Sequence, residues 1–235
     1  MEFALTSNIK IIDLCLLIDK TLIISDIHIG YEEELNKKGI LIPRLSFIEI
    51  GKRLEKIMKE VKGKIDTIII NGDIKHEFGT ISEQEWRETI KIIDYLSQYG
   101  KLYLVRGNHD KTLGPIADKK NIELVESYTI GDILIAHGDT IIKTDNKIKT
   151  IIIGHEHPAV SIKEDNRLEK YKCFLKGKYE KKTLIVMPSF NPVTEGTDIT
   201  KSEPLSPYLQ GDLREFEVYI VSDKIYEFGK LEKFY

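Results

Sequence analysis

Short runs of β-branched and other apolar residues recur along the chain, and polar residues follow each run. Runs of this length, rich in Ile, Leu and Val, predict buried β-strands. A further run at 216–228 includes the turn residues Ser222-Asp223-Lys224 and predicts a β-hairpin. The other predicted strands lie at 15–25, 66–70, 101–105, 132–136, 150–153 and 183–187.

Two segments between the strands, 43–63 and 82–100, have apolar residues at helical spacing. The second begins with Ser82 and Glu85, which have the spacing of a capping box. The residues expected on the buried faces are Leu45, Ile48, Leu54, Ile57, Met58 and Val61 in the first helix and Trp86, Ile90, Ile93 and Leu96 in the second.

Strands alternate with helices in the first half of the chain and dominate the second half. This order predicts a layered α/β sandwich. We expect residues 1–235 to form a single domain, because the length is within the usual range and we see no linker or repeat. The segment 191–212 is rich in Pro, Gly, Ser and Thr and predicts a long surface loop.

The composition argues against a membrane or secreted protein. No apolar run reaches the roughly 18 residues that span a bilayer, and the N-terminus lacks the features of a signal peptide. The two cysteines, Cys15 and Cys173, are expected to be packing residues in a reducing cytoplasm. The net charge of −3 gives no general attraction to nucleic acid. We therefore expect a cytoplasmic protein without a membrane partner.

The histidines define the candidate chemistry, since five of the six lie just beyond an apolar run. Carboxylates and one asparagine occupy the same strand ends. In layered α/β sheets these ends face one crevice, where ligands bind. Polar clusters that are scattered in the sequence are therefore expected to meet in space: Asp26 and His28, Asp73, Asn108 to Asp110, His137, and His155 with His157.

Imidazole and carboxylate groups without thiolates suit hard or borderline metals such as Mn²⁺, Fe, Ni²⁺ or Zn²⁺. In Asp26-x-His28 and His155-x-His157, an extended backbone would direct two side chains to one side, about 7 Å apart. A single polar residue at a strand end is usually a turn residue with a local hydrogen bond. Five such clusters together predict a metal site.

The ordered set DIH, NGD, GNHD, HGD and GHEHP, within residues 26–157, resembles the calcineurin-like metallophosphoesterases. The segments GDIKHEF, YKCFL and VMPSFNPVTEG are similar to archaeal SbcD-related phosphoesterases and bacterial ligase-associated DNA-repair endonucleases. The resemblance implies an α/β/β/α sandwich of two mixed sheets flanked by helices. It also implies two divalent metal ions, with Mn²⁺ preferred and Ni²⁺, Fe or Zn²⁺ as alternatives.

The resemblance further implies a role for each matching residue. His109 would not bind metal, and Asp110 would orient its imidazole. Glu156 replaces a residue that is usually small and should point away from the metals. Seven residues would be metal ligands: Asp26, His28 and His157 for the first ion, Asn108, His137 and His155 for the second, and Asp73 for both.

These residue types suit hydrolysis of a phosphodiester. Two ions bridged by Asp73 would lower the pKa of a shared water and neutralise the phosphate during in-line attack by the resulting hydroxide. His109 would protonate the leaving alkoxide, with Asp110 favouring its protonated form. Arg106 is either a phosphate contact or a solvated cation, and His76 either reaches the substrate or bonds within its loop.

The substrate is less well defined by the sequence. Segment 163–182 has eight basic and four acidic residues with three aromatics interleaved, which fits either a nucleic-acid contact or a charged surface hairpin. We predict a metal-dependent, nuclease-like phosphodiesterase acting on DNA or RNA, with a DNA-repair protein or a second copy of the chain as partner. The alternatives are a hydrolase of small phosphoesters, such as a cyclic nucleotide or a nucleotide pyrophosphate, and a metal-free protein-binding scaffold.

Overall fold

The computed structural model describes residues 2–43, 45–79, 81–165 and 167–235. Within these ranges, seven strands form a mixed sheet in the order β1-β2-β3-β4-β5-β6-β7. Strands β1 to β4 pair antiparallel, and β4 to β7 pair parallel. The strands are β1 (Glu2–Ala4), β2 (Ile9–Ile12), β3 (Cys15–Ile18), β4 (Thr21–Ser25), β5 (Thr67–Asn71), β6 (Lys101–Val105) and β7 (Glu123–Val125).

A second mixed sheet contains nine strands of the described part of the chain. Its path is β14-β11-β12-β13-β10-β9-β8, and β15 and β16 extend from β12. The predicted C-terminal hairpin is present as β15 and β16. The strands are β8 (Ser127–Ile130), β9 (Ile133–Ala136), β10 (Thr150–Ile153), β11 (Pro158–Glu164), β12 (Arg167–Tyr179), β13 (Lys182–Val186), β14 (Thr197–Asp198), β15 (Glu217–Val221) and β16 (Ile225–Lys230).

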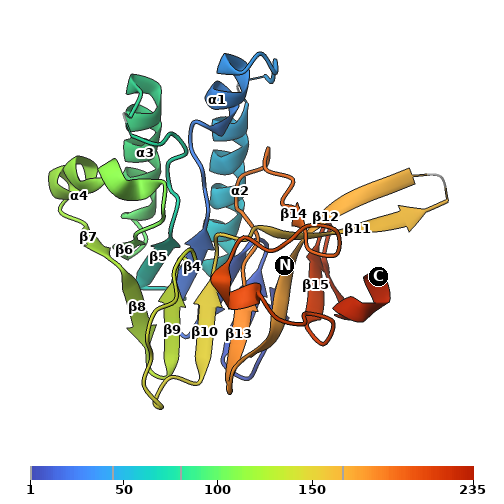
Figure 1. The fold of residues 1–235 in the computed structure, drawn as a ribbon. Coiled ribbons are helices and arrows are strands. Elements are labelled where there is room, and N and C mark those ends of the chain that lie inside the picture. The colour runs from blue at the N-terminus through green and yellow to red at the C-terminus, as the bar shows by residue number, and fades with distance from the viewer. Residues whose placement is uncertain (1, 44, 80, 166) are drawn as a thin grey trace.

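The α-helices gather on one side of the molecule, at the upper left of Figure 1. The predicted fold class, two mixed sheets flanked by helices, is confirmed. No helix in the described ranges combines the length and apolar character needed to cross a membrane. The α-helices are α1 (Tyr31–Lys37), α2 (Ser46–Val61), α3 (Glu83–Leu96) and α4 (Gly114–Lys120), and the 3₁₀ helices are η1 (Asp110–Thr112), η2 (Pro207–Leu209) and η3 (Leu231–Phe234).

Both predicted helices are present, but their buried faces differ from the prediction. Leu45 and Ile48 are each 51% exposed, because α2 begins only at Ser46 and its buried stripe continues through Ile50. In α3, the Ser82 hydroxyl accepts from the backbone N–H of residue 85 at 3.1 Å, as the capping spacing predicts. The predicted core residues Trp86 and Ile90 are only partly buried.

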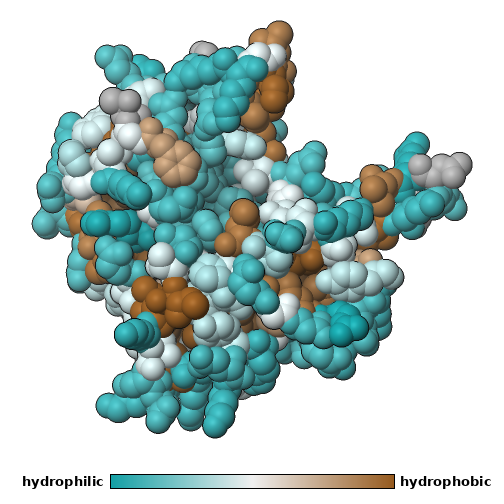
Figure 2. Space-filling model, viewed as in Figure 1, coloured by the Kyte–Doolittle hydropathy of each residue, from teal (hydrophilic) through white to brown (hydrophobic). Residues whose placement is uncertain are grey.

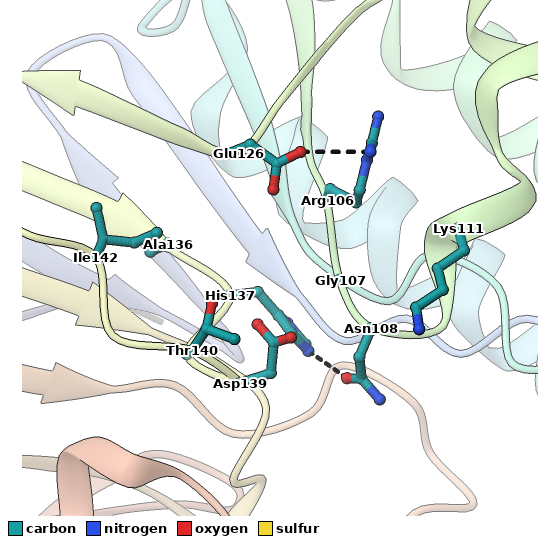
Figure 3. Close-up of a pocket in the computed structure, with 11 residues that line it drawn as sticks. Arg106, Gly107, Asn108, Lys111, Glu126, Ala136, His137, Asp139, Thr140 and Ile142 are labelled. Carbon is teal, nitrogen blue, oxygen red and sulfur yellow. Dashed lines mark hydrogen bonds and ion pairs between the residues drawn. The ribbon is translucent and has the colours of Figure 1, made fainter.

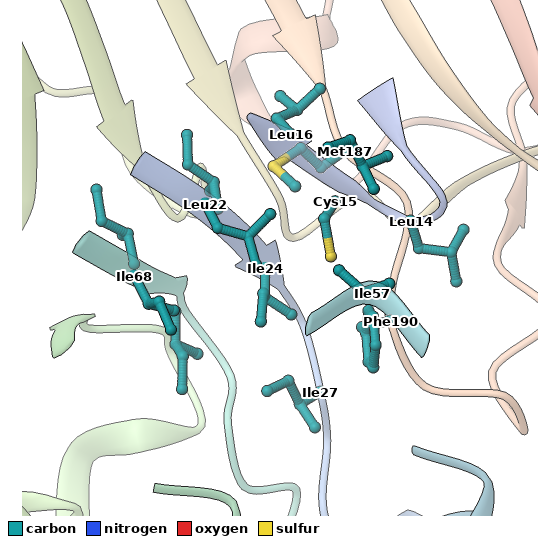
Figure 4. Packing of buried hydrophobic residues seen from close by; sticks show 14 of the residues in the cluster. Leu14, Cys15, Leu16, Leu22, Ile24, Ile27, Ile57, Ile68, Met187 and Phe190 are labelled. Atoms are coloured by element: carbon teal, nitrogen blue, oxygen red, sulfur yellow. The ribbon is translucent and has the colours of Figure 1, made fainter. Parts of the chain in front are cut away.

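The main core lies between the sheets and the helices. Figure 4 shows Leu22 and Ile24 of β4 and Ile57 of α2 in this cluster, together with Met187 and Phe190, which follow β13. Both cysteines are buried and free, in agreement with the predicted packing role.

A second apolar cluster covers the other face of the second sheet. Residues Leu184 and Val186 of β13 pack in a cluster with Tyr208, Leu209 and Phe216. The segment 191–212, predicted as a surface loop, is largely irregular, and most of its residues are exposed or partly exposed. Its buried side chains Ile199, Tyr208 and Leu209 pack against the sheet.

The hairpin of β11 and the first part of β12 extends beyond the sheet. We call it the arm and define it as residues 158–165 and 167–172. It pairs internally from Ala159 opposite Lys172 onward, whereas β12 pairs with β15 and β13 only from Cys173 and Leu175 onward. Figures 1 and 2 show the arm standing clear of the body, with a mostly hydrophilic surface.

Candidate metal centre

The residues predicted to bind metal lie together where strands of both sheets end. Strands β4, β5 and β6 run parallel in one sheet, and β9 and β10 run parallel in the other. Their carboxyl ends meet at one edge, as expected for a ligand site in an α/β fold. The backbone N–H of His155 donates to the Asp26 carboxylate at 3.1 Å, which joins the two sheets at the site.

One donor group consists of Asp26, His28 and His157. A ligand atom from each lies within 4.8 Å of the other two. The Nε2 atoms of His28 and His157 are 3.2 Å apart, and Nε2 of His157 is 3.3 Å from Oδ1 of Asp26.

The second donor group consists of Asp73, His137 and His155, whose ligand atoms also lie within 4.8 Å of one another. Nδ1 of His155 is 3.2 Å from Nε2 of His137. Figure 3 shows Asn108 and His137 turned toward each other, with Oδ1 of Asn108 2.9 Å from Nε2 of His137.

Asp73 belongs to the second donor group and also lies close to His28 of the first. Its Oδ2 atom is 3.3 Å from Nε2 of His137 and 3.7 Å from Nε2 of His28. Donor atoms about 2 Å from a common ion are about 3 to 4 Å from one another, so these separations fit metal coordination. The carboxylates of Asp26 and Asp73 are also almost fully buried, at 0% and 2% exposure, and buried negative charges need compensation. The donor set therefore fits two divalent ions that share Asp73.

The electrostatics of Asp73 and His28 agree with this fit, whereas those of His137 favour a bound proton in place of a metal ion. Burial opposes ionisation of Asp73, but hydrogen bonding to His137 and its charge hold the pKa of the carboxyl below its usual range. Burial, together with the charge of His157, lowers the pKa of His28 well below its usual value. Burial also disfavours the charged form of His137, yet Asp73 raises its pKa to about 9. An ionised carboxylate and a neutral imidazole are the forms in which these side chains could bind a metal ion, and an ion at His137 would have to displace its proton.

The prediction of an extended backbone at the two ligand pairs is wrong. Asp26, His28, His155 and His157 have φ of 55°, 46°, 63° and 50°, and Asp73 has 44°. This left-handed region is uncommon for residues other than glycine, and such residues cluster at functional sites. Each chain segment turns sharply where its strand ends. These turns bring the ligand side chains together, and the alternation of side chains along an extended strand does not.

The segment after β13 holds the Asp26–His28 turn in place. The Ser189 hydroxyl donates to the carbonyl of Asp26 at 2.8 Å, and the Asn191 amide donates to the next two carbonyls, both at 2.9 Å. Lys172 in turn donates to the carbonyl of Ser189 at 2.7 Å and to that of Asn191. Ser189 and Asn191 were not singled out from the sequence, because their partners lie more than 160 residues away.

Glu156 points away from the donor groups, as predicted. Its carboxylate accepts from the backbone N–H groups of Leu205 and Ser206 at 2.7 and 2.9 Å, and its side chain is fully buried. Glu156 therefore links residues 205 and 206, in the segment that covers the second sheet, to the turn that carries His155 and His157.

His76 contacts the site, a role that the sequence left open. Its Nδ1 atom is 3.1 Å from Nδ1 of His28, and its Nε2 atom pairs with the carboxylate of Glu34. Burial lowers the pKa of His76 to about 4, against the opposing effect of Glu34. His76 and Glu34 together orient the His28 ring so that its Nε2 atom faces the first donor group. Residues that hydrogen-bond to the second nitrogen of a metal-binding histidine commonly have this role. Glu34 had no signal in the sequence that distinguished it from its acidic neighbours.

The predicted contact of Asp110 with the His109 imidazole is wrong. Nδ1–H of His109 donates to the carbonyl oxygen of His76, whereas the Asp110 carboxylate accepts from the backbone N–H of Gly107 at 3.0 Å. Burial and repulsion from Asp73 raise the pKa of Asp110 to about 7. Asp110 therefore shapes the turn that carries His109 rather than orienting its ring.

A cleft of about 400 Å³ opens beside Asn108 and His137. Arg106 lines it, but its guanidinium turns toward Glu126 at 3.4 Å (Figure 3), which favours the alternative that Arg106 is a solvated cation. Lys111, which the sequence did not single out, extends toward Asn108 in the same view. It is the better candidate for a cation facing the substrate.

Comparison with known proteins agrees with this fold. A histidine–aspartate cluster at the strand ends of a two-sheet α/β sandwich is of a kind that suits a metal-dependent hydrolase. The chain belongs to the calcineurin-like phosphoesterase family, whose family model matches residues 20–204. The family uses divalent metal ions, and the donor groups described above are of the type that could bind them.

The fold is shared with a solved structure. The nuclease MPE of Pseudomonas putida matches with a TM-score of 0.69 and 17% identity, over 97% of this chain and 98% of that one. A protein of unknown function from Aquifex aeolicus matches with a TM-score of 0.39 and 23% identity, over 58% of this chain and 78% of that one. Comparison with curated proteins gives no match.

Proposed function

We propose that the protein is a cytoplasmic two-metal phosphodiesterase that acts on nucleic acid, with a role in DNA repair. The observation that carries the proposal is the position of Asp73, whose Oδ2 lies within 3.7 Å of a ring nitrogen of each donor group. A shared carboxylate suits two-metal hydrolysis of a phosphoester. The fold shared with the Pseudomonas putida nuclease motivates nucleic acid as the substrate class.

Two divalent ions would be held by the two donor groups, with Asn108 as a further ligand of the second. When bound, such ions offset the charge of the phosphate oxygens and lower the pKa of water toward neutrality. Imidazole, carboxylate and amide donors without a thiolate suit Mn²⁺, Ni²⁺, Fe or Zn²⁺. Among these we propose Mn²⁺, which the family resemblance favours.

We infer that His109 protonates the leaving alkoxide. Its backbone N–H donates to Oδ1 of Asp73 at 2.9 Å, and its Nε2 is 3.9 Å from Oδ2 of the same carboxylate. The His76 carbonyl accepts from Nδ1–H, which leaves Nε2 to carry the proton that is transferred. The backbone of His109 thus belongs to the metal centre, while its imidazole is available to the substrate.

A metal titration tests the proposed function. Protein stripped with a chelator should not hydrolyse bis-p-nitrophenyl phosphate, and added Mn²⁺ should restore the activity with two ions bound per chain. The loaded enzyme should then cleave single-stranded DNA or RNA with a higher kcat/KM than a cyclic nucleotide or a nucleotide pyrophosphate. Preference for the small esters would favour the alternative enzyme, and absence of both metal binding and hydrolysis would favour a metal-free scaffold.

The structure divides the basic segment 163–182 into two parts. The turn between β12 and β13, with Lys181 and Lys182, lies at the opposite end of the strands from the site, since Thr183 pairs with Thr150 at the start of β10. Lys176 pairs with Glu217 at 2.5 Å. Lys178 is exposed and pairs with Thr183 near the same far end. The arm carries the exposed basic residues Lys163, Arg167 and Lys170.

Neutralising Lys163 and Arg167 together, by changing both to glutamine, is expected to weaken DNA binding and flatten its dependence on salt. Each lost phosphate contact should reduce the slope of log K against log salt by about 0.7 for a single strand. Binding is measured by fluorescence anisotropy over a salt series. Lys181→Gln with Lys182→Gln removes the same charge at the far end and should leave the slope unchanged. Equal effects of both pairs would show that only net charge matters.

A further inference from the structure

An exposed aromatic ring stands next to His109. Phe78 is 64% exposed, and its ring centroid lies 3.7 Å from that of His109, with 32° between the two planes. The His109 imidazole also stacks with His76, at 5.0 Å and 25°. Phe78 is therefore part of a group of rings at the candidate site, and most of its own surface is open to solvent.

The chain that leads to Phe78 is firmly anchored. The Glu85 carboxylate is fully buried and accepts from the backbone N–H groups of His76 and Glu77, at 2.7 and 2.9 Å. The buried Lys75 donates to the carbonyl of Glu77, and its backbone bridges to Ile29. The three residues directly before Phe78 are thus held by hydrogen bonds to buried groups.

An exposed apolar ring beside a proton donor is suited to contact the base of the nucleoside that leaves the phosphorus. The group that leaves the phosphorus accepts its proton from His109, and in nucleic acid that group is the hydroxyl of a nucleoside. Its base is separated from this oxygen only by the sugar. A base stacks on an aromatic side chain without regard to its sequence, because every base has a flat π-face.

We propose that Phe78 is the stacking platform for the base of the nucleotide on the leaving side of the scissile phosphate. This inference rests on the proposed function, since it requires nucleic acid as substrate and His109 as the proton donor. It makes Phe78 a specificity-determining residue: it favours nucleosides over simple alcohols as leaving groups and does not select among bases.

Phe78 also packs on His109, so a simple truncation cannot separate base stacking from support of the imidazole. A double-mutant cycle between enzyme and substrate separates the two. The substrate is a short oligothymidylate with phosphorothioates at every linkage except one, which fixes the site of cleavage. Two variants of it carry an abasic residue on one side or the other of that linkage, and analysis of the product ends identifies the leaving side.

With wild-type enzyme and Mn²⁺, loss of the base on the leaving side should lower kcat/KM by about 10- to 100-fold, and loss on the other side should have less effect. Phe78→Ala should lower kcat/KM on the intact oligonucleotide by a similar factor, and the leaving-side abasic substrate should then be cleaved no more slowly than the intact one. Phe78→Trp should restore the dependence on the base. Phe228→Ala, which truncates an exposed ring on β16, should behave as wild type.

Two results would overturn the inference. If Phe78→Ala slows the intact and abasic substrates equally, the ring acts only through His109. If wild-type enzyme cleaves the intact and abasic substrates at the same rate, no base is recognised there. Cleavage of bis-p-nitrophenyl phosphate without cleavage of any oligonucleotide would overturn the proposed nucleic-acid function, and this inference with it.

Discussion

Replacing Asp73 by asparagine is expected to abolish hydrolysis of every phosphoester and to reduce the number of metal ions bound per chain. The substitution keeps the shape of the side chain and removes its charge, while Oδ2 is the atom that both donor groups share. Metal ions contribute several kcal/mol to such reactions, and about 1.4 kcal/mol corresponds to tenfold, so a loss of about 10³-fold or more is expected. Metal analysis and kcat/KM on bis-p-nitrophenyl phosphate measure the two effects.

Asp13 provides a matched control for this variant. It is also a buried aspartate with a left-handed backbone, at 5% exposure and φ 55°, but it pairs with Arg53 at 3.0 Å. Asp13→Asn should therefore keep the full metal content, even if it lowers the melting temperature. An Asp73→Asn protein that still binds two ions and hydrolyses the diester would refute the bridging role.

Replacing His109 by alanine is expected to separate substrates by their leaving groups. General-acid help is worth about 10²- to 10⁴-fold and matters most when the leaving oxygen is strongly basic. Cleavage of DNA or RNA should fall by this factor, while p-nitrophenyl esters, whose leaving group needs no proton, should retain much more activity. Both ions should remain, because the substitution keeps the backbone N–H of residue 109, which donates to Asp73 at 2.9 Å.

The variant Asn108→Ala serves as the comparison for His109→Ala. Asn108→Ala removes an amide oxygen that lies 2.9 Å from Nε2 of His137, so it should lower metal content and slow every ester alike. Metal analysis and the two substrate series on both variants distinguish a ligand from an acid. Loss of metal in His109→Ala, or an equal loss on both classes of ester, would contradict the assignment of His109.

Much of the fold follows from local pattern. The central strands and the helices α2 and α3 could be predicted because their apolar residues repeat with the period of the element. The predicted run 15–25 forms two strands, β3 and β4, and the short strands β1, β2, β7, β8 and β14 were not predicted. Helices α1 and α4 span only seven residues each, too few for a periodic stripe, and were not predicted. The sequence did not show that the arm projects from the sheet. A hairpin projects where its neighbouring strands end before it does, and the local sequence of the hairpin does not contain that information.

The sequence predicted which residues meet at the candidate site but not the backbone turns that bring them together. Strand ends of parallel sheets meet, so the seven predicted ligands could be grouped without a structure. The left-handed turns at Asp26 and His28 depend on hydrogen bonds from Ser189 and Asn191, which a local pattern cannot show. The partner of Asp110 was missed for a related reason: adjacency in the sequence suggested His109, whereas the 3₁₀ turn η1 directs the carboxylate to Gly107.

The left-handed backbone at five of the predicted ligands has an evolutionary consequence. Such conformations cost of order 1 kcal/mol or more for each residue other than glycine, and the total stability of a domain is only about 5–15 kcal/mol. Selection for catalysis therefore maintains residues that selection for stability alone would replace. A descendant that lost its activity should drift toward glycine at Asp26, His28 and His157 and become more resistant to heat as its site disappears.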